Sequence, residues 1–284
     1  MKIAALAFAA VVASDAMVMP LDRETAEWNR PVAPFAIAEG LYYVGAAEVS
    51  SFAIRTPAGI VLIDSGFHQS VPLVIESLKT LGFGARDVKW ILESHAHYDH
   101  VGGIAELKRL TGATVIASAE DAALMARGGL GDFAFGDRFR FPPVSVDRIV
   151  ADREALDFGG VKLTANITRG HTKGCTTWTM QARVDGVPKD VVFLCSVTTP
   201  GYRLVDNDKY PRIVADYRAS FARLRSLPCD ILLASHGSMF DLSGKRAKMR
   251  SGGNPFVDPA GCRRFIDASE CAFENELARQ QGRN

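Results

Sequence analysis

Residues 94–100, Ser94-His95-Ala96-His97-Tyr98-Asp99-His100, hold three of the six histidines of the chain, with an aspartate among them. The apolar, β-branched run 88–93 in front of this motif is typical of a buried strand. Behind it, residues 101–110 place apolar side chains at helical spacing, and Gly112 supplies a stop. The sequence therefore predicts four good metal ligands on the turn between a strand and a helix.

The spacing of these ligands favours two metal ions. In an extended segment, residues i and i+2 point the same way, so His95 and His97 can face one ion. Asp99 and His100 are adjacent at the turn, and they can face a second ion. Imidazoles with a carboxylate suit zinc in a hydrolytic site that keeps an open coordination position. The alternative is a polar loop whose histidines only cap a helix, which three histidines and an aspartate within six residues disfavour.

His-x-His-x-Asp-His after a strand resembles the metallo-β-lactamase superfamily. The resemblance implies an αββα sandwich, an α/β fold in which two mixed β-sheets pack face to face with helices on both outer faces. The metal site is then expected at one edge of the two sheets. The order of predicted elements agrees, because strands followed by helices occur twice along the chain. No linker interrupts the pattern, so residues 21–284 are expected to form one domain.

Hydrophobic periodicity and turn residues predict the individual elements. Strands are expected at 41–44, 51–56, 60–63, 88–93, 113–117, 161–165, 176–182, 190–194 and 230–234. Helices are expected at 71–81, 101–110, 119–127, 217–227 and 259–281. The loop that follows residue 128 carries four phenylalanines, of which some are expected to line a substrate groove: Phe133, Phe135, Phe139 and Phe141.

The composition excludes several classes of protein. The 284 residues can bury a sizeable core, and 33 basic against 32 acidic residues leave a formal net charge of +1. This balance gives no electrostatic footprint for nucleic acid or acidic lipid. The body of the chain has no apolar run of about 18 residues, so no membrane span is expected. A monomer is expected.

The N-terminus resembles a secretory signal peptide. The apolar run 3–13 follows a single lysine, and small residues then stand where a signal peptidase reads. Residues 1–20 are therefore expected to be removed, with cleavage near Ala13 or Ala16, and the mature protein is expected in the periplasm. The alternative is a frayed hydrophobic N-terminus.

Two further histidines follow predicted strands, His171 after 161–165 and His236 after 230–234. The resemblance implies two zinc ions per chain, one held by His95, His97 and His171 and the other by Asp99, His100 and His236. Three protein ligands for each ion leave an open position on both, as in catalytic sites.

The segment after strand 190–194 separates the branches of the superfamily. Some lactamase subclasses place a cysteine ligand there, whereas glyoxalase II enzymes and lactonases place a bridging aspartate. This chain has Ser196, with Cys195 one residue away, so the pattern resembles the subclass B3 metallo-β-lactamases. The resemblance covers most of the chain after residue 28. Arg169 departs from it, because many relatives have proline at that position.

This resemblance implies zinc-dependent hydrolysis of the amide bond of β-lactam antibiotics by a metal-bound hydroxide, and hence antibiotic resistance. Asp99 would orient the nucleophile, the hydroxyls of Ser196 and Thr198 would meet the substrate carboxylate, and Phe135 and Phe139 would contact substrate side chains. A related dinuclear zinc hydrolase of lactones or thioesters is the alternative enzyme, and a non-catalytic periplasmic zinc-binding protein is the alternative outside enzymes. The Ser-x-x-Lys and Gly-x-Ser-x-Gly patterns of covalent serine mechanisms do not occur in the chain.

The five cysteines fit an oxidising compartment. The resemblance implies two disulfides, Cys175–Cys195 and Cys229–Cys262. Cys271 is left over and is expected to be buried. His68 matches no ligand and is expected at the surface or beside the ligands. Asp64 is expected to support the motif through hydrogen bonds.

Overall fold

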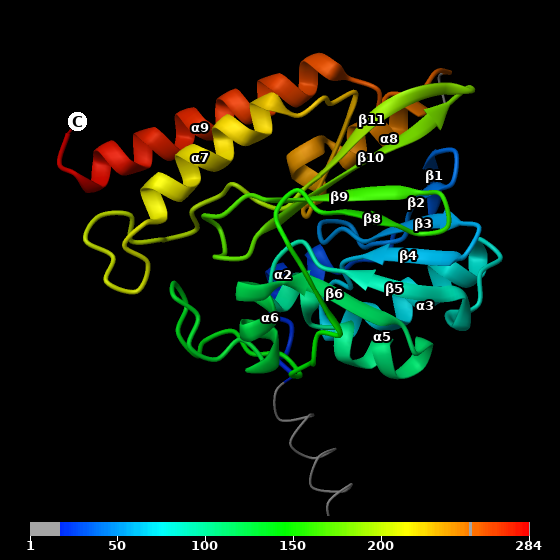
Figure 1. Cartoon of the computed structure of the whole chain (residues 1–284), viewed down its shortest axis with the longest axis horizontal. Helices are drawn as coiled ribbons and strands as arrows, with labels where there is room; N and C mark the ends of the chain where they lie inside the picture. The colour runs from blue at the N-terminus through cyan, green and yellow to red at the C-terminus, as the bar shows by residue number, and fades with distance from the viewer. Residues whose placement is uncertain (1–17, 250–251, 284) are drawn as a thin grey trace, which may run out of the picture.

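The computed structural model of the protein describes residues 18–249 and 252–283 (Figure 1). Nearly all of the predicted signal peptide, including its expected cleavage sites, lies outside the described residues. Within them, no helix is both long and apolar enough to cross a membrane. The expectation of a single domain over residues 21–284 stays a prediction.

Two mixed β-sheets form the centre of the molecule (Figure 1). The first has seven strands in the order of their numbering: β1 (Phe35–Ala38), β2 (Leu41–Tyr43), β3 (Phe52–Thr56), β4 (Gly59–Ile63), β5 (Val88–Leu92), β6 (Thr114–Ser118) and β7 (Arg148–Val150). Strands β1 to β4 pair antiparallel, and β4 to β7 pair parallel.

The second sheet has five strands in the order β12-β11-β10-β9-β8. They are β8 (Ala155–Asp157), β9 (Lys162–Ile167), β10 (Thr176–Val184), β11 (Val187–Leu194) and β12 (Ile231–Ala234). Strands β11 and β12 pair parallel and the other neighbours pair antiparallel.

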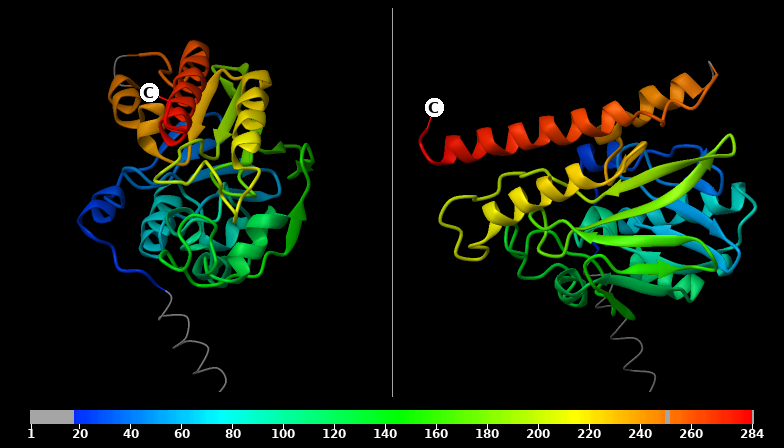
Figure 2. Two further views of the ribbon diagram at one scale, coloured as in Figure 1. Left: turned by 90° about the vertical axis from the view of Figure 1, so that its left-hand side faces the viewer. Right: turned by 45° about the horizontal axis from the view of Figure 1, so that its top comes forward.

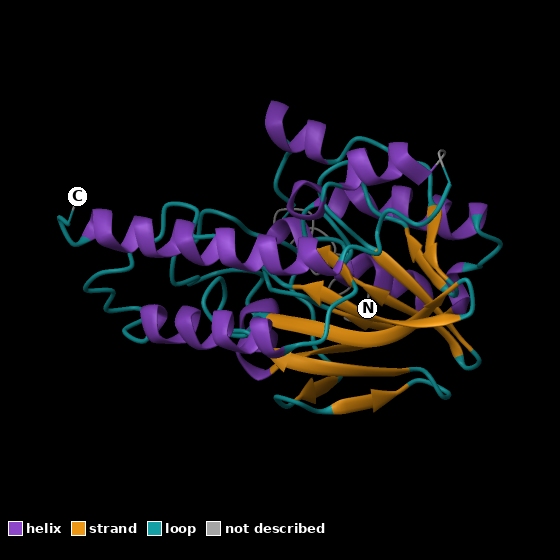
Figure 3. Cartoon of the chain, turned by 90° about the horizontal axis from the view of Figure 1, so that it is seen from above, coloured by secondary structure: helices purple, strands orange, loops and turns teal. Residues whose placement is uncertain are grey.

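Helices cover both outer faces of the sheet pair (Figure 2). The first sheet carries α3 (Val71–Thr80), α5 (Ile104–Thr111) and α6 (Ala119–Ala126), and the second carries α7 (Ile213–Ser226) and α9 (Pro259–Gln280). Seen from above, α7 and α9 lie side by side and extend past the ends of the strands (Figure 3). The remaining elements are short: α2 (Arg23–Trp28), α4 (Tyr98–Val101), α8 (Leu242–Lys248), η1 (His68–Ser70), η2 (Ala85–Asp87) and η3 (Gly237–Phe240). This arrangement confirms the predicted αββα sandwich.

Strand β4 shows why its sequence suits a central position in the sandwich. Successive side chains of a strand point to opposite faces. Val61 and Ile63 accordingly join the core between the sheets, while Ile60 and Leu62 pack under α3 and α5. A strand that is buried on both faces has a continuous apolar sequence, and residues 60–63 form such a run.

The helix predicted at 101–110 differs from the prediction at its start. The chain first forms the single turn α4, and α5 begins only at Ile104. At Gly102, a Cβ would lie 2.2 Å from the carbonyl oxygen of Tyr98, so only glycine permits this close approach. The predicted end is confirmed, because Gly112 adopts a left-handed φ of 74° and its N–H donates to the carbonyl of Lys108.

The two predicted disulfides are confirmed, but the prediction for Cys271 is wrong. Cys175 pairs with Cys195 and Cys229 pairs with Cys262, whereas Cys271 is exposed on α9. The buried side of this helix carries Cys262, Ile266, Phe273 and Leu277. At 3.6 residues per turn, position 271 lies about 180° around the helix from position 262. Cys271 therefore faces solvent.

This cysteine pattern predicts the outcome of thiol labelling. In denaturant without a reductant, alkylation should modify one cysteine per chain, and peptide mapping should place it at Cys271. After reduction, all five cysteines should react. Mass spectrometry of both samples checks this, and three labelled thiols before reduction would mean that one of the disulfides does not form.

Candidate metal centre

Six side chains at one edge of the sheet pair form the candidate metal centre. His95 and His97 follow β5, and Asp99 and His100 belong to α4. The second sheet contributes the other two residues, His171 after β9 and His236 after β12. Within each predicted triad the candidate ligand atoms all lie within 4.8 Å of one another; the triads are His95, His97 and His171, and Asp99, His100 and His236.

The motif loop is held by the carboxylate of Asp64, at the end of β4. Its oxygens accept hydrogen bonds from the backbone N–H and the hydroxyl of Ser94, both at 2.6 Å. Asp64 itself adopts a left-handed φ of 59°, which aspartate tolerates better than most residues. The predicted supporting role of Asp64 is thereby confirmed.

Each of the five histidines has one ring nitrogen turned toward an outer polar group. His171 donates from Nδ1 to the carbonyl of Thr198 at 2.9 Å, and Nδ1 of His95 lies 3.0 Å from the hydroxyl of Ser94. Three carboxylate oxygens lie farther from the remaining rings, in the pairs His100–Asp64 at 3.8 Å, His236–Glu48 at 3.7 Å and His97–Asp132 at 3.9 Å. Outer partners of this kind fix the tautomer and orientation of metal-binding histidines.

Burial keeps most of these imidazoles neutral. Desolvation lowers the pKa of His97 to about 4 and the pKa values of His171 and His236 to about 3. For Asp99, burial acts to raise the pKa, but the charge of His100 and a hydrogen bond from His100 hold it below its ordinary value. Neutral imidazole and ionised carboxylate are the forms that bind metal ions.

The donor set fits a divalent metal ion. Nε2 of His95 is buried and has no hydrogen-bond partner among the described residues. An unsatisfied buried polar atom costs about 1–3 kcal/mol, and a bound cation would remove that cost. Nε2 of His100 lies 3.1 Å from Asp99 Oδ2 and 3.2 Å from His236 Nε2, so these ligand atoms already converge.

Gly170, just before His171, sets the position of the third histidine. Its φ is +141°, and a Cβ there would lie 2.8 Å from the ring of Tyr217, so only glycine fits. Arg169, which replaces the proline of many relatives, contributes a carbonyl that accepts a hydrogen bond from Ser220. The departure at Arg169 therefore leaves His171 within its triad.

Asp121 in α6 joins two of the loops that carry candidate ligands. Its carboxylate accepts hydrogen bonds from the N–H of Ala96 at 3.0 Å, the hydroxyl of Thr172 at 2.8 Å and the N–H of Gly174 at 3.0 Å. Ala96 stands between two candidate ligands, and Thr172 follows a third. Burial raises the pKa of Asp121 above its ordinary value, while these three hydrogen bonds oppose the increase.

An open cavity of about 480 Å³ lies over both triads. Of the predicted substrate-binding residues, Phe135, Phe139 and Thr198 line it. Ser196 is buried behind Thr198, and the two hydroxyls lie 3.2 Å apart. His68 belongs to neither triad and lies half-buried in η1.

Other cavity residues were not expected from the sequence, namely Trp28, Glu48, Asp132, Arg138, Ser238 and Met239. They come from α2, from the β2–β3 turn, from η3 and from the loop after residue 128 that carries Phe133, Phe135, Phe139 and Phe141, which we call the phenylalanine loop. Each of them stands in a turn, a loop or a short helix without a local motif, so only its place in the tertiary structure connects it with the site.

Replacement of Asp121 by alanine should loosen the metal-ligand loops. We expect the free energy of unfolding to fall by roughly 2–4 kcal/mol, because three buried donors lose their acceptor. We also expect less metal bound per chain at limiting zinc. Denaturant titration and metal analysis check this, with Glu120→Ala, at an exposed position of the same helix, as the control. Unchanged metal content in a destabilised variant would limit Asp121 to a role in stability.

Comparison with known proteins places this geometry in a family. The family model described as "Metallo-beta-lactamase superfamily" matches residues 44–236. A solved metallo-beta-lactamase of Cronobacter sakazakii, which carries an HARLDQ motif, is 43% identical with a TM-score of 0.88, covering 93% of this chain and 96% of that one. A subclass B3 metallo-beta-lactamase of Bradyrhizobium japonicum is 35% identical with a TM-score of 0.85, covering 90% and 97%.

Curated relatives match over a shorter stretch. A probable metallo-hydrolase of Burkholderia pseudomallei is 33% identical over 101 residues, which are 35% of this chain and 33% of that protein. The chain thus spans about a third of the length of the curated relatives that it matches. Family membership and the two triads together imply metal binding. The chain belongs to the metallo-beta-lactamase superfamily and, within it, to the subclass B3 metallo-beta-lactamases.

Proposed function

We propose that the protein is a zinc-dependent β-lactamase that hydrolyses penicillins, cephalosporins and carbapenems and so confers antibiotic resistance. The observation that carries this proposal is a pair of complete ligand triads beneath one open cavity, with Ser196 where a bridging carboxylate would stand in lactone and thioester hydrolases. The relatives that match nearly the whole chain are named metallo-beta-lactamases, which supports the same reaction.

We infer that the centre binds two zinc ions per chain. His95, His97 and His171 would hold one ion, and Asp99, His100 and His236 the other. Imidazole and carboxylate ligands suit zinc, and three ligands for each ion leave a position open for chemistry. When bound, zinc supplies a Lewis acid and lowers the pKa of a coordinated water to about 7.

Asp99 is the catalytic side chain in this proposal. Its Oδ2 lies 3.1 Å from His100 Nε2 and 3.5 Å from His236 Nε2, and its pKa is below the ordinary value, so the carboxylate stays ionised at neutral pH. An ionised carboxylate there can accept a hydrogen bond from the attacking water and orient it toward the lactam carbonyl. Hydrolysis adds the elements of this water across the C–N bond of the ring.

The walls of the cavity would bind the rest of the substrate. The exposed hydroxyl of Thr198 can donate to the substrate carboxylate, and Ser196 behind it can orient that hydroxyl. The ring centroids of Phe135 and Phe139 lie 5.0 Å apart, and both rings present an apolar surface to substrate side chains. Burial of apolar substrate groups against such rings is favourable.

We further infer that the protein is exported to the periplasm and acts there as a monomer without nucleic-acid or membrane partners. The apolar run 3–13 supports export. Two disulfides also fit an oxidising compartment. The net charge of +1 supports the absence of a nucleic-acid partner.

The first test is carbapenem hydrolysis by the purified, zinc-loaded protein. We expect turnover that a chelator abolishes and added zinc restores. We expect His171→Ala to lower kcat/KM at limiting zinc by more than about 100-fold, because even changes in the outer partners of metal ligands cost about 10- to 100-fold. His68→Ala, outside both triads, should keep its activity. Turnover of a lactone or thioester, with no lactam hydrolysed, would replace this proposal with its alternative.

A second test concerns the hydroxyls at the cavity wall. Thr198→Val should raise KM about tenfold with a smaller effect on kcat, because a hydrogen bond to a charged group is worth about 1.5–3 kcal/mol. Ser196→Ala should have a weaker effect, since Ser196 lies behind Thr198. Steady-state kinetics with one carbapenem measures both, and Thr80→Val at the exposed end of α3 is the control. A wild-type KM for Thr198→Val would remove this residue from the substrate site.

A further inference from the structure

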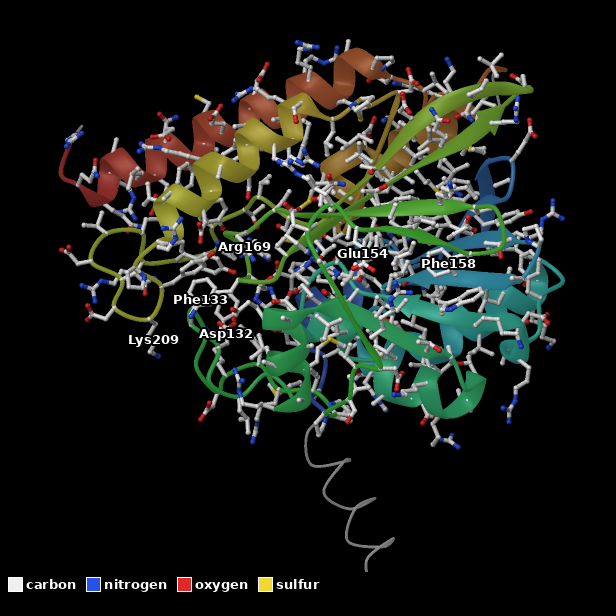
Figure 4. All side chains as sticks on the ribbon, viewed as in Figure 1. Asp132, Phe133, Glu154, Phe158, Arg169 and Lys209 are labelled. Carbon is white, nitrogen blue, oxygen red and sulfur yellow. A yellow bond between two sulfur atoms is a disulfide. The ribbon has the colours of Figure 1, made fainter. Side chains whose placement is uncertain are left out.

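Asp132 belongs to the phenylalanine loop, and its carboxylate contacts the backbone of this loop on one side and faces the candidate metal ligand His97 on the other. Asp132 follows α6 and is 5% exposed. Figure 4 shows it beside Phe133 on this loop, away from Glu154 and Phe158 along the strands. The proposed ligand sets and substrate contacts do not include Asp132.

One oxygen of Asp132 shapes the loop. Oδ1 accepts hydrogen bonds from the N–H of Ala134 at 2.7 Å and the N–H of Phe135 at 2.8 Å. The backbone of Asp132 also exchanges two hydrogen bonds with Gly136, which closes a five-residue turn. Aspartate and asparagine favour turns because their side chains accept bonds from backbone N–H groups just ahead of them. This turn places Phe135 on the cavity wall.

The other oxygen of Asp132 faces the metal centre. Oδ2 lies 3.9 Å from Nε2 of His97, and both atoms are buried with no hydrogen-bond partner in the part of the chain that the structure describes. Two unpartnered buried polar atoms that face each other need only a small shift to reach the usual N–H···O distance of about 2.9 Å. The His97 ring also contacts the Phe135 ring edge to face, with centroids 5.3 Å apart.

We propose that Asp132 is a positioning residue that serves both parts of the site. Through Oδ2 it fixes the tautomer and orientation of His97, and through Oδ1 it holds Phe135 over the cavity. The inference rests on the proposed function in one respect, namely that His97 is a metal ligand. One carboxylate would then position both the cavity wall that contacts the substrate and the first metal triad, which is His95, His97 and His171.

Asparagine at position 132 separates the two roles. Its side-chain oxygen can still accept from the N–H groups of Ala134 and Phe135, so the turn is retained. Its NH₂ group would then face Nε2 of His97, and because this group only donates, it could not accept a hydrogen bond from the His97 N–H. We expect Asp132→Asn to weaken metal binding at the first triad by about 10- to 100-fold, with little change in KM at saturating zinc.

Two other variants complete the series. Asp132→Ala removes both oxygens and should weaken metal binding and raise KM together. Phe135→Ala should raise KM and leave metal affinity unchanged. Asp137→Asn is the matched control: Asp137 lies in the same loop and accepts a hydrogen bond from the N–H of Gly131, but it is exposed and does not line the cavity. This control should match the wild type in both measurements.

The measurements are zinc affinity and stoichiometry by chelator competition, and the absorption spectrum of the cobalt-substituted protein. In Asp132→Asn the cobalt absorption bands of the first triad should shift, and the zinc affinity of that triad should fall. The melting temperature of the metal-free variant should stay near that of Asp137→Asn. A wild-type affinity and spectrum in Asp132→Asn would overturn the inference and leave Asp132 as a turn residue only. A wild-type protein that binds two metal ions but hydrolyses no lactam would instead overturn the proposed function.

Discussion

Two buried carboxylates, Asp64 and Asp121, hold the motif loop from the strands on either side of β5. Asp64 ends β4 and accepts two hydrogen bonds from Ser94, while Asp121 follows β6 and accepts one from Ala96. Burying a carboxylate is costly unless hydrogen bonds satisfy it. These hydrogen bonds form only when the parallel strands β4, β5 and β6 end in register, because the two carboxylates and the loop follow these strands. The position of the loop and the order of the sheet therefore depend on each other.

The second sheet is attached to the same loop through the backbone. Trp178 in β10 donates from its ring N–H to the carbonyl of Glu93 at 2.9 Å, and the N–H of Thr176 donates to the carbonyl of Ser94 at 2.8 Å. Near the end of β12, the N–H of Ser50 donates to the carbonyl of Ser235. The two contacts from β10 hold the segment just after His171 against the motif loop, and the contact at Ser235 holds the residue before His236 against the β2–β3 turn.

The sequence allowed prediction of the parts that are encoded locally. The strand, the metal-binding motif and the following helix are contiguous, so periodicity and spacing were enough to predict them. The disulfides and the two distant histidines needed the family resemblance, since no local pattern links Cys229 to Cys262. Asp121 could not be recognised, because an aspartate in the first turn of a helix also reads as an ordinary helix start. The error at Cys271 was avoidable, since the buried stripe of α9 already excludes that position.

The candidate metal ligands and the cavity walls come from different parts of the fold, so substitutions can affect one without the other. The six candidate ligands lie in α4 and in the segments that follow β5, β9 and β12, and a packed sandwich positions them with little freedom. The cavity walls come from α2, from η3, from the β2–β3 turn and from the phenylalanine loop, and loops tolerate replacement more readily than strands do. Substrate preference could therefore vary through the walls while the triads stay constant. Asp132 limits this independence, because a loop change that moves its turn also moves the group that faces His97.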